Sequence, residues 1–210
     1  GLFCVAEILI LHCSSKHDEE AQEETGSRLR QYSGRILTNL TYADNLNKVL
    51  LMNMRGLLET VRGQLQHKSE EIQQAMASIL RNLSWQADKE GRDLLRQKGV
   101  VRTLTECVIC AKGEGTLKAM LSALWNLSGH CPANREDICS VEGSLAFLVS
   151  TLTYRSPSKS AMVIESGGGI LRNISSIVAT NETFRQILRE HNCLQTLLQQ
   201  LTSASLTIVS

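Results

Sequence analysis

The chain has 210 residues, of which 42% are hydrophobic and 20% are charged. A chain of this size and composition can bury a core, which excludes disorder along its whole length. Lys and Arg number 22 against 21 Asp and Glu, so the net charge indicates no general affinity for nucleic acid or for an anionic membrane. Only two prolines occur, which excludes collagen-like and proline-rich classes and leaves long stretches free to form helices.

An apolar stretch opens the chain, from Leu2 to Leu11, with Glu7 in its interior. It is too short to span a bilayer, and it lacks the basic flank and the small-residue cleavage site of a secretory signal. We therefore expect no membrane insertion and interpret the stretch as the second helix of a repeat whose first helix is missing. Residues 14–27 follow with five acidic side chains, and we expect them to form a solvated acidic loop.

The dominant feature is a short phrase that occurs four times, each copy containing an asparagine followed two residues later by Ser or Thr. The asparagines are Asn39, Asn82, Asn126 and Asn173, separated by 43, 44 and 47 residues. A period in the low forties is typical of stacked helical repeats or of propeller blades. The apolar residues before each asparagine recur at spacings of three and four, which predicts helices and excludes blades.

A second phrase begins with Gly56, Gly99, Gly143 and Asn192, which follow the asparagines by 17, 17, 17 and 19 residues. Glycine and asparagine tolerate the left-handed backbone conformation that ends one helix before the next begins. Each unit is therefore predicted to contain a short helix, as over 92–97 and 135–139, then a corner, a medium helix and a long helix that carries the asparagine.

Three helices in a repeat of about 42 residues resemble an armadillo repeat. Five longer stretches are more specific: Ser78–Trp85, Leu121–Ser128, Leu145–Val149, Leu152–Ser156 and Ile164–Asn173. They resemble the adenomatous polyposis coli (APC) tumour-suppressor family. The resemblance extends from about Leu29 to Ser210 and is weak before that. It implies an all-α, right-handed armadillo solenoid in one domain, with full repeats over 43–86, 87–130 and 131–178 and partial repeats over 1–42 and 179–210. We expect the chain to be a fragment of a longer solenoid.

The four asparagines also match the acceptor motif for N-linked glycosylation. That reading is disfavoured because they lie within predicted helices, whereas acceptor asparagines belong on exposed loops. Two alternatives remain: the asparagines tie neighbouring helices together, or they form a ladder of amides that binds the main chain of an extended peptide. The armadillo resemblance favours the peptide ladder.

Carried over by position, the family resemblance implies a peptide groove that includes seven residues. They are Asn39, Lys48, Gln74, Arg81, Asn82, Trp85 and Asn126. The repeat adds Arg172 and Asn173. Guanidinium groups bind carboxylates in a planar, bidentate geometry, so Arg81 and Arg172, together with Lys48, indicate an acidic ligand. The alternative is that these three side chains are ordinary solvated surface charges. Tyr42 departs from the phenylalanine that is usual in the family. The tryptophan array of nuclear-import receptors is absent.

Other candidate chemistry is weak. Cys107 and Cys110 have the spacing of a zinc pair, but the pair falls in a predicted helix with Cys110 at or near the core, so no metal site is expected. The seven cysteines are interpreted as reduced, mostly buried thiols of an intracellular protein. The cluster Gly167–Gly169 lacks the strand and the Lys-Ser/Thr of a phosphate loop and is expected to permit close helix contact or to leave an opening for a ligand. No cofactor and no catalytic group are expected.

The sequence therefore predicts a non-catalytic scaffold that binds peptide segments of proteins. The family resemblance implies a cytoplasmic negative regulator of Wnt signalling in the β-catenin destruction complex, with links to the cytoskeleton or cell cortex. It implies partners such as Rho guanine-nucleotide exchange factors, kinesin-associated adaptors and destruction-complex components. The β-catenin-binding and microtubule-binding parts of that family lie outside this chain. One alternative is another armadillo adaptor, such as a junctional catenin, and a second is an enzyme or metalloprotein.

Overall fold

The computed structural model describes residues 1–14 and 20–208, with side chains described for 1–13 and 24–202. Within these residues the chain forms α-helices and no strands, as predicted. In chain order they are α1 (Leu2–Ser14), α2 (Glu20–Leu40), α3 (Asn45–Met52), α4 (Leu57–Gln64), α5 (Glu70–Ser84), α6 (Lys89–Gln97), α7 (Val100–Cys110), α8 (Glu114–Ser128), α9 (Pro132–Cys139), α10 (Ser144–Thr151), α11 (Met162–Thr180), α12 (Glu182–Glu190) and α13 (Cys193–Ile208).

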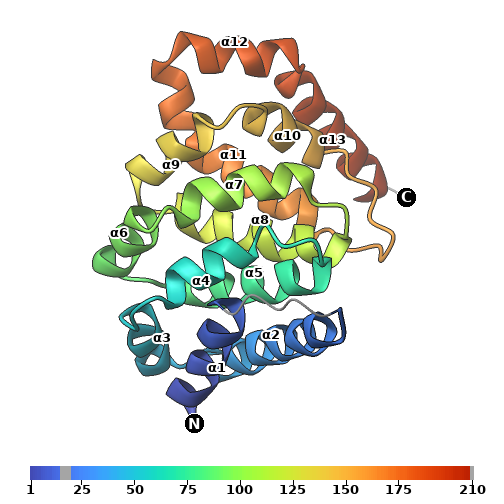
Figure 1. Ribbon diagram of the computed structural model, residues 1–210. Helices are drawn as coiled ribbons and strands as arrows, with labels where there is room; N and C mark the ends of the chain where they lie inside the picture. Colours follow the sequence, from blue (N-terminus) through green and yellow to red (C-terminus); the bar gives the residue numbers. More distant parts are fainter. Residues whose placement is uncertain (15–19, 209–210) are drawn as a thin grey trace.

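The helices repeat in the order short, medium and long, and equivalent helices stack on one another. The long helices α2, α5, α8 and α11 each contact the next, and so do the medium helices α1, α4, α7 and α10. In Figure 1 the repeats stack from the N-terminal end at the bottom to the C-terminal end at the top, with the long helices in one layer and the medium helices packed across them. The short helices α3, α6 and α9 lie along one edge of this stack. The fold is an armadillo-type solenoid.

Each predicted corner is present and adopts the left-handed conformation. The φ angles are +82° at Gly56, +72° at Gly99, +76° at Gly143 and +53° at Asn192. The left-handed conformation costs a residue with a Cβ atom roughly 1–2 kcal/mol, which explains the preference for glycine at these corners. The medium helix begins at the residue after each corner, so the corner sets the angle between the short and medium helices.

The core fills the space between the two layers. The residues of α5 that the three-and-four spacing predicts to face inward, such as Ile72, Met76, Ile79 and Leu83, are at most 1% exposed. They form one hydrophobic cluster with side chains of the medium helices, including Leu57. The opposite side of each long helix is left free of this packing and forms the surface described in the next section.

The predicted acidic loop is wrong for residues 20–27, which belong to the first turns of α2. Acidic side chains near a helix N-terminus are favoured by the helix dipole, and Glu24 forms an ion pair of 2.7 Å with Arg28 one turn later. These two effects favour helix in a segment whose charge suggested a loop. Residues 15–19 of the predicted loop lie outside the described residues.

The cysteines are less buried than predicted. Cys131, Cys139 and Cys193 are buried and Cys107 is half-buried, but Cys110 is the exposed last residue of α7 rather than a core residue. Burial raises the pKa of the Cys107 thiol to about 11 and that of Cys139 to about 12. Among the described residues no group of three or more His, Cys, Asp or Glu side chains is placed to hold a metal ion.

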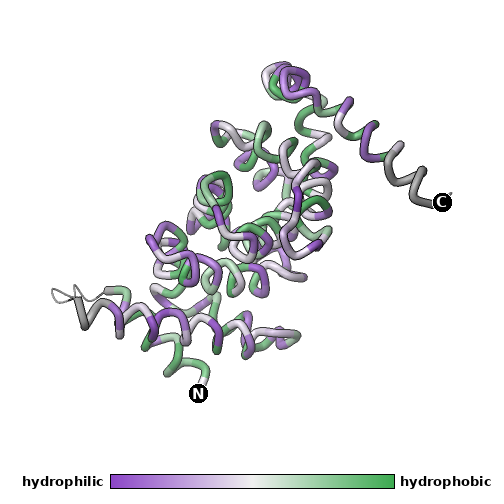
Figure 2. Tube along the Cα trace, turned by 90° about the vertical axis from the view of Figure 1, so that its right-hand side faces the viewer, coloured by the Kyte–Doolittle hydropathy of each residue, from purple (hydrophilic) through white to green (hydrophobic). Residues whose placement is uncertain are grey.

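Both terminal helices carry exposed apolar side chains. On α1 these include Phe3 and Leu11, and on α13 they include Leu194, Leu198 and Leu201, which are 63% to 76% exposed. Figure 2 shows the last helix extending away from the rest of the stack. None of the helices in the described part of the chain is long and apolar enough to cross a membrane.

Candidate functional site

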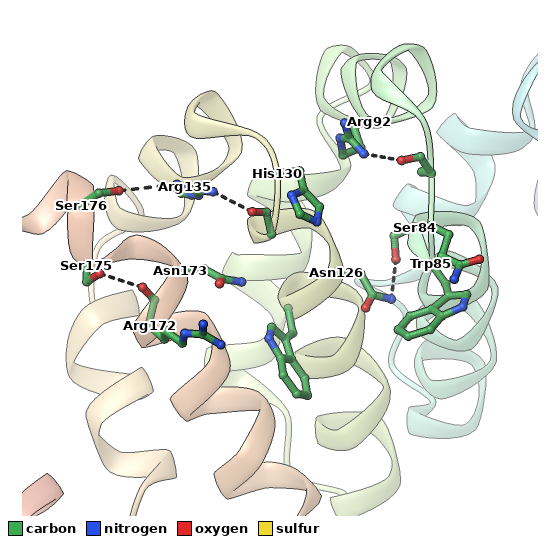
Figure 3. Close-up of a pocket in the computed structure, with 14 residues that line it drawn as sticks. Ser84, Trp85, Arg92, Asn126, His130, Arg135, Arg172, Asn173, Ser175 and Ser176 are labelled. Atoms are coloured by element: carbon green, nitrogen blue, oxygen red, sulfur yellow. Dashed lines mark hydrogen bonds between the residues drawn. The ribbon is translucent and has the colours of Figure 1, made fainter.

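Three of the four repeated asparagines, Asn82, Asn126 and Asn173, tie a long helix to the one before it. Their Nδ2 atoms donate to a carbonyl or hydroxyl oxygen of the preceding long helix. Asn82 donates to Thr38 O (2.7 Å) and Thr41 Oγ1 (3.2 Å), Asn126 to Arg81 O (3.1 Å) and Ser84 Oγ (3.2 Å), and Asn173 to Ser128 Oγ (2.9 Å). Figure 3 shows the bond between Asn126 and Ser84. The interpretation that the asparagines link neighbouring helices is therefore confirmed for their amide nitrogens.

This linkage explains the hydroxyl residue two positions after each asparagine. Thr41, Ser84 and Ser128 are at most 3% exposed. Each hydroxyl donates its own proton to a carbonyl of its helix, at 2.7, 3.0 and 2.8 Å respectively. A lone pair of the hydroxyl oxygen is thereby left to accept from the asparagine of the next repeat. The Asn-x-Ser/Thr pattern therefore reflects this contact between repeats, and the asparagines that carry it lie within the long helices.

The amide oxygens of the asparagines remain unused. Among the described residues no donor bonds to the Oδ1 atom of Asn82, Asn126 or Asn173, whereas their Nδ2 atoms do bond. Each asparagine therefore presents a hydrogen-bond acceptor at intervals of one repeat along the long-helix surface. An acceptor of this kind can bind a main-chain N–H of an extended ligand.

Three cavities follow one another along this surface. The first is small, about 130 Å³, and is lined by Asn39 and Gln74 together with Arg35 and Ser78. Asn39 is exposed, unlike Asn82, which is 7% exposed. The first cavity therefore holds two of the sequence-predicted groove residues.

The second cavity has a volume of about 430 Å³ and brings together Lys48, Arg81, Asn82, Trp85 and Asn126. Lys48 is buried rather than solvated, and its Nζ atom donates to Trp85 O at 3.2 Å, one residue beyond α5. Burial lowers the pKa of Lys48, and the nearby Asp44 carboxylate opposes that shift. Arg81 forms no ion pair with any described carboxylate, so its guanidinium is the open charge of this cavity.

The third cavity is the largest, about 750 Å³, and contains Arg172 and Asn173. Trp85 and Asn126 line both the second and the third cavity, so the two are adjacent. Trp85 is 56% exposed and offers a flat apolar surface between them. All nine residues predicted from the sequence thus lie along one surface of the long helices, which we call the groove.

Arg92, His130 and Arg135 also line the third cavity and were missed by the sequence reasoning. The repeat contained a signal for the two arginines. Lys48, Arg92 and Arg135 each lie four residues after the residue that caps a short helix, namely Asp44, Asp88 and Cys131. Aligning the short helices as well as the long ones would have placed both arginines beside Lys48 in the repeat.

The glycine cluster permits close helix contact. A Cβ atom built on Gly169 would lie 2.3 Å from the Trp125 ring, and one built on Gly167 would lie 1.8 Å from Thr151 Oγ1. Gly168 has nothing closer than 3.8 Å. Gly169 lies four residues before Asn173, so the missing side chain makes room for the indole of the preceding repeat on the floor of the groove.

The stacked three-helix repeats and the asparagine-lined groove define an armadillo-repeat protein. Solved structures agree: the chain superposes on a designed armadillo repeat protein with a TM-score of 0.69 and 20% identity, covering 93% of this chain and 73% of that one. An engineered protein of the same kind of fold gives a TM-score of 0.73 with 18% identity, covering 95% and 72% of the two chains. No protein-family model matches the chain.

In sequence the chain belongs to the adenomatous polyposis coli family. It is 55% identical to the adenomatous polyposis coli homolog of Xenopus laevis and 54% identical to adenomatous polyposis coli protein 2 of Homo sapiens, in each case over its full 210 residues. It is 30% identical over 207 residues to the adenomatous polyposis coli protein-related protein 1 of Caenorhabditis elegans. The chain spans 7%, 9% and 17% of these relatives respectively.

Proposed function

We propose that this chain is a non-catalytic scaffold whose groove binds extended, acidic segments of partner proteins. The observation that supports the proposal most directly is the bonding of Asn82, Asn126 and Asn173. In each of them the amide nitrogen bonds to the preceding long helix while the amide oxygen has no partner among the described residues. An extended peptide running along the groove can donate its main-chain N–H groups to these oxygens. Specificity then comes from the cavities between the asparagines.

The charge of the groove favours an acidic ligand. Lys48, Arg81 and Arg172 line its cavities, and no Asp or Glu does so. A designed armadillo repeat protein with a TM-score of 0.68 to this chain, 17% identity and coverage of 94% of this chain and 82% of that one was solved with the basic peptide (KR)4. The arginine-lined groove described here suits the opposite charge, because guanidinium groups pair with carboxylates in a bidentate fork.

The family suggests which proteins supply such segments. We propose Rho guanine-nucleotide exchange factors, kinesin-associated adaptors and destruction-complex components, in a cytoplasmic protein that restrains Wnt signalling and contacts the cytoskeleton or cell cortex. A screen of overlapping 15-residue peptides from these proteins tests the choice, with cadherin-tail peptides on the same array for the rival junctional catenin. Binding of cadherin-tail peptides alone would favour the rival.

Calorimetric titration with the tightest peptide tests the groove itself. Arg81→Ala removes the open charge of the second cavity and should weaken binding roughly tenfold to a hundredfold, the usual effect of losing a hydrogen bond to a charged group. The matched control is Lys89→Ala on α6, whose side chain is 86% exposed and paired with Asp93. Equal affinities for wild type and both variants would place the binding site elsewhere.

A further inference from the structure

The third cavity of the groove concentrates positive charge without any acidic side chain to neutralise it. Arg92, Arg135 and Arg172 line it together with His130, and its lining contains no Asp or Glu. Figure 3 shows Arg135 and Arg172 on one side of the cavity, Arg92 at its upper end and His130 between Arg92 and Arg135. Three arginines thus line one cavity of about 750 Å³, and the guanidinium group is well suited to pairing with anions.

These arginines differ from two arginines that lie elsewhere on the solenoid. Arg96 pairs with Asp137 at 2.7 Å and Arg102 pairs with Glu106 at 2.9 Å. In contrast, Arg92, Arg135 and Arg172 pair with no carboxylate in the described part of the chain. Their charge is therefore available to a ligand.

Two of the three guanidinium groups are held in place by backbone oxygens. Arg135 donates from Nε to Ser128 O at 2.8 Å and from Nη2 to Gly129 O at 2.7 Å, and its Nη1 lies 3.5 Å from Ser176 Oγ. Arg92 donates from Nη1 to Ala87 O. Carbonyl oxygens orient a guanidinium without cancelling its charge, and each group keeps further N–H donors for a ligand. Preorganisation of this kind reduces the entropy lost on binding.

We propose that this cavity binds a phosphorylated serine or threonine of the peptide in the groove, an inference that rests on the proposed function. One carboxylate is satisfied by one guanidinium fork, as expected for Arg81 in the second cavity. A phosphoryl group carries a charge of about −1.5 to −2 and three acceptor oxygens, so it can engage several guanidinium groups at once. The cavity with three open arginines therefore fits the dianion better than a glutamate or aspartate.

The surroundings of the cavity point to a peptide as the carrier of the phosphate. Asn126 and Asn173, whose amide oxygens are unused, lie on its floor, and Trp85 connects it to the second cavity. A main chain bound to these amides would run through the cavity that the arginines line. The balanced charge of the whole chain, +1, does not favour the general electrostatic attraction on which binding to a membrane or to nucleic acid relies.

Three degenerate 11-residue peptide libraries test the proposal by fluorescence anisotropy. They are identical except for the central residue, which is phosphoserine, glutamate or serine. We expect the phosphoserine library to bind at least about tenfold more tightly than the glutamate library. Arg172→Gln should remove that preference, since Arg172 is exposed and makes no described side-chain bond whose loss would perturb folding. Arg102→Gln, on the outer surface of α7, is the matched control and should retain the preference.

The outcomes separate this inference from the proposed function. Equal binding of the phosphoserine and glutamate libraries, or a preference that Arg172→Gln leaves intact, overturns the phosphate site while leaving the peptide groove standing. Failure of all three libraries to bind overturns both. Vesicles that contain a phosphoinositide are included as a further probe, and Arg172-dependent binding to them without any preference among the peptides would assign the cavity to a lipid headgroup and overturn the proposal.

Discussion

The side chains of Asn82, Asn126 and Asn173 each have a structural part and a part that is open to a ligand: the amide nitrogen bonds to the preceding long helix, and the amide oxygen is a free acceptor within the described part of the chain. The amide nitrogen of Asn82 bonds to the preceding long helix at 2.7 Å, and the residue is 7% exposed. Replacing it with alanine would remove its hydrogen bonds to Thr38 O and Thr41 Oγ1, each of which typically contributes about 0.5–1.5 kcal/mol. A loss of peptide binding in such a variant therefore mixes a structural effect with a functional one. Arg81 is the cleaner probe of the groove because its guanidinium has no structural partner.

A double-mutant cycle measures the structural task. We expect Asn126→Ala and Ser84→Ala each to lower the free energy of unfolding by about 1–2 kcal/mol, and the pair to show a coupling energy of about 1 kcal/mol because the two side chains share a hydrogen bond of 3.2 Å. Urea unfolding of the four proteins gives the numbers. Ser78, whose hydroxyl bonds only to Gln74 O of its own helix, is the control, and its coupling to Asn126 should be near zero. If the effects of Asn126→Ala and Ser84→Ala are additive, the hydrogen bond between the two side chains does not stabilise the stacking of the repeats.

Glu114 links neighbouring repeats at the other end of the long helices. Its carboxylate accepts hydrogen bonds from Ser156 and Ser158 in the segment before α11 and pairs with Lys118 at 3.0 Å. Glu70 has the same place in α5 and accepts from the Lys112 N–H at 3.1 Å. The hydrogen bond from Ser156, followed by that from Lys118, lowers the pKa of Glu114 to about 2. The ionised carboxylate is therefore favoured in the folded chain.

The pH dependence of unfolding tests this link. A folded-state pKa below the ordinary value of 4.5 means that the contribution to stability is complete above about pH 4.5 and is lost as the pH falls toward 2. Glu114→Gln should be less stable than wild type at pH 7, and the difference should shrink between pH 4.5 and 3. Urea unfolding at these pH values gives the comparison. Glu106→Gln, which removes an exposed partner of Arg102, should change stability little throughout. A difference for Glu114→Gln that stays constant with pH would contradict the assignment.

At the scale of single helices, α11 contains two neighbouring glycines, Gly168 and Gly169, at which we expect an alanine substitution to have opposite effects on stability. Gly169→Ala would force a Cβ atom against the Trp125 ring, 2.3 Å away, whereas Gly168→Ala meets nothing closer than 3.8 Å. We expect Gly169→Ala to destabilise by about 1–3 kcal/mol through overpacking and to change the tryptophan fluorescence. Gly168→Ala should be neutral or stabilising by up to about 1 kcal/mol, since alanine favours helix. Equal thermal stabilities of the two variants would show that the indole does not depend on Gly169.

The elements themselves were largely predictable because two local rules determine them. The three-and-four spacing of apolar residues located the long helices, and Gly56, Gly99 and Gly143 located the corners. The prediction of a loop was wrong for residues 20–27 because it relied on their density of charge. The ion pair between Glu24 and Arg28 and the helix dipole favour a helix there. Charge alone does not distinguish a solvated loop from the exposed surface of a helix.

The groove was predictable in outline and not in its bonding. The nine predicted residues lie on one surface because equal spacing in a regular stack places equivalent residues in a row. The burial of Lys48 against Trp85 O depends on a contact between the short and the long helix of one repeat, and the orientation of Arg135 by two carbonyl oxygens depends on contacts across a turn. The acceptors in these contacts are main-chain carbonyl oxygens, which every residue has. The sequence therefore does not indicate which of them a side chain will bond, and these contacts could not be predicted from it.

The whole molecule is a stack in which each repeat packs mainly on its neighbours, so stability should vary along it. The central long helices α5 and α8 each contain nine buried residues. In α12, all of which the structure describes, no residue is buried. Beyond it, α13 exposes Leu194, Leu198 and Leu201. Among the described side chains, burial is therefore more extensive in α5 and α8 than in α12.

Hydrogen exchange measured by mass spectrometry tests this gradient. Opening α12 and α13 uncovers little buried surface, so their amides should exchange at least about a hundredfold faster than those of α5 and α8, a difference of roughly 3 kcal/mol in opening free energy. Helix α1 should be intermediate because Ala6 and Leu9 are fully buried while Phe3 and Leu11 are exposed. The measurement is repeated at two protein concentrations, since association through the exposed leucines of α13 would protect that helix only at the higher one. Protection of α12 and α13 equal to that of α5 in the dilute sample would show that the solenoid opens as a single cooperative unit and would contradict the gradient.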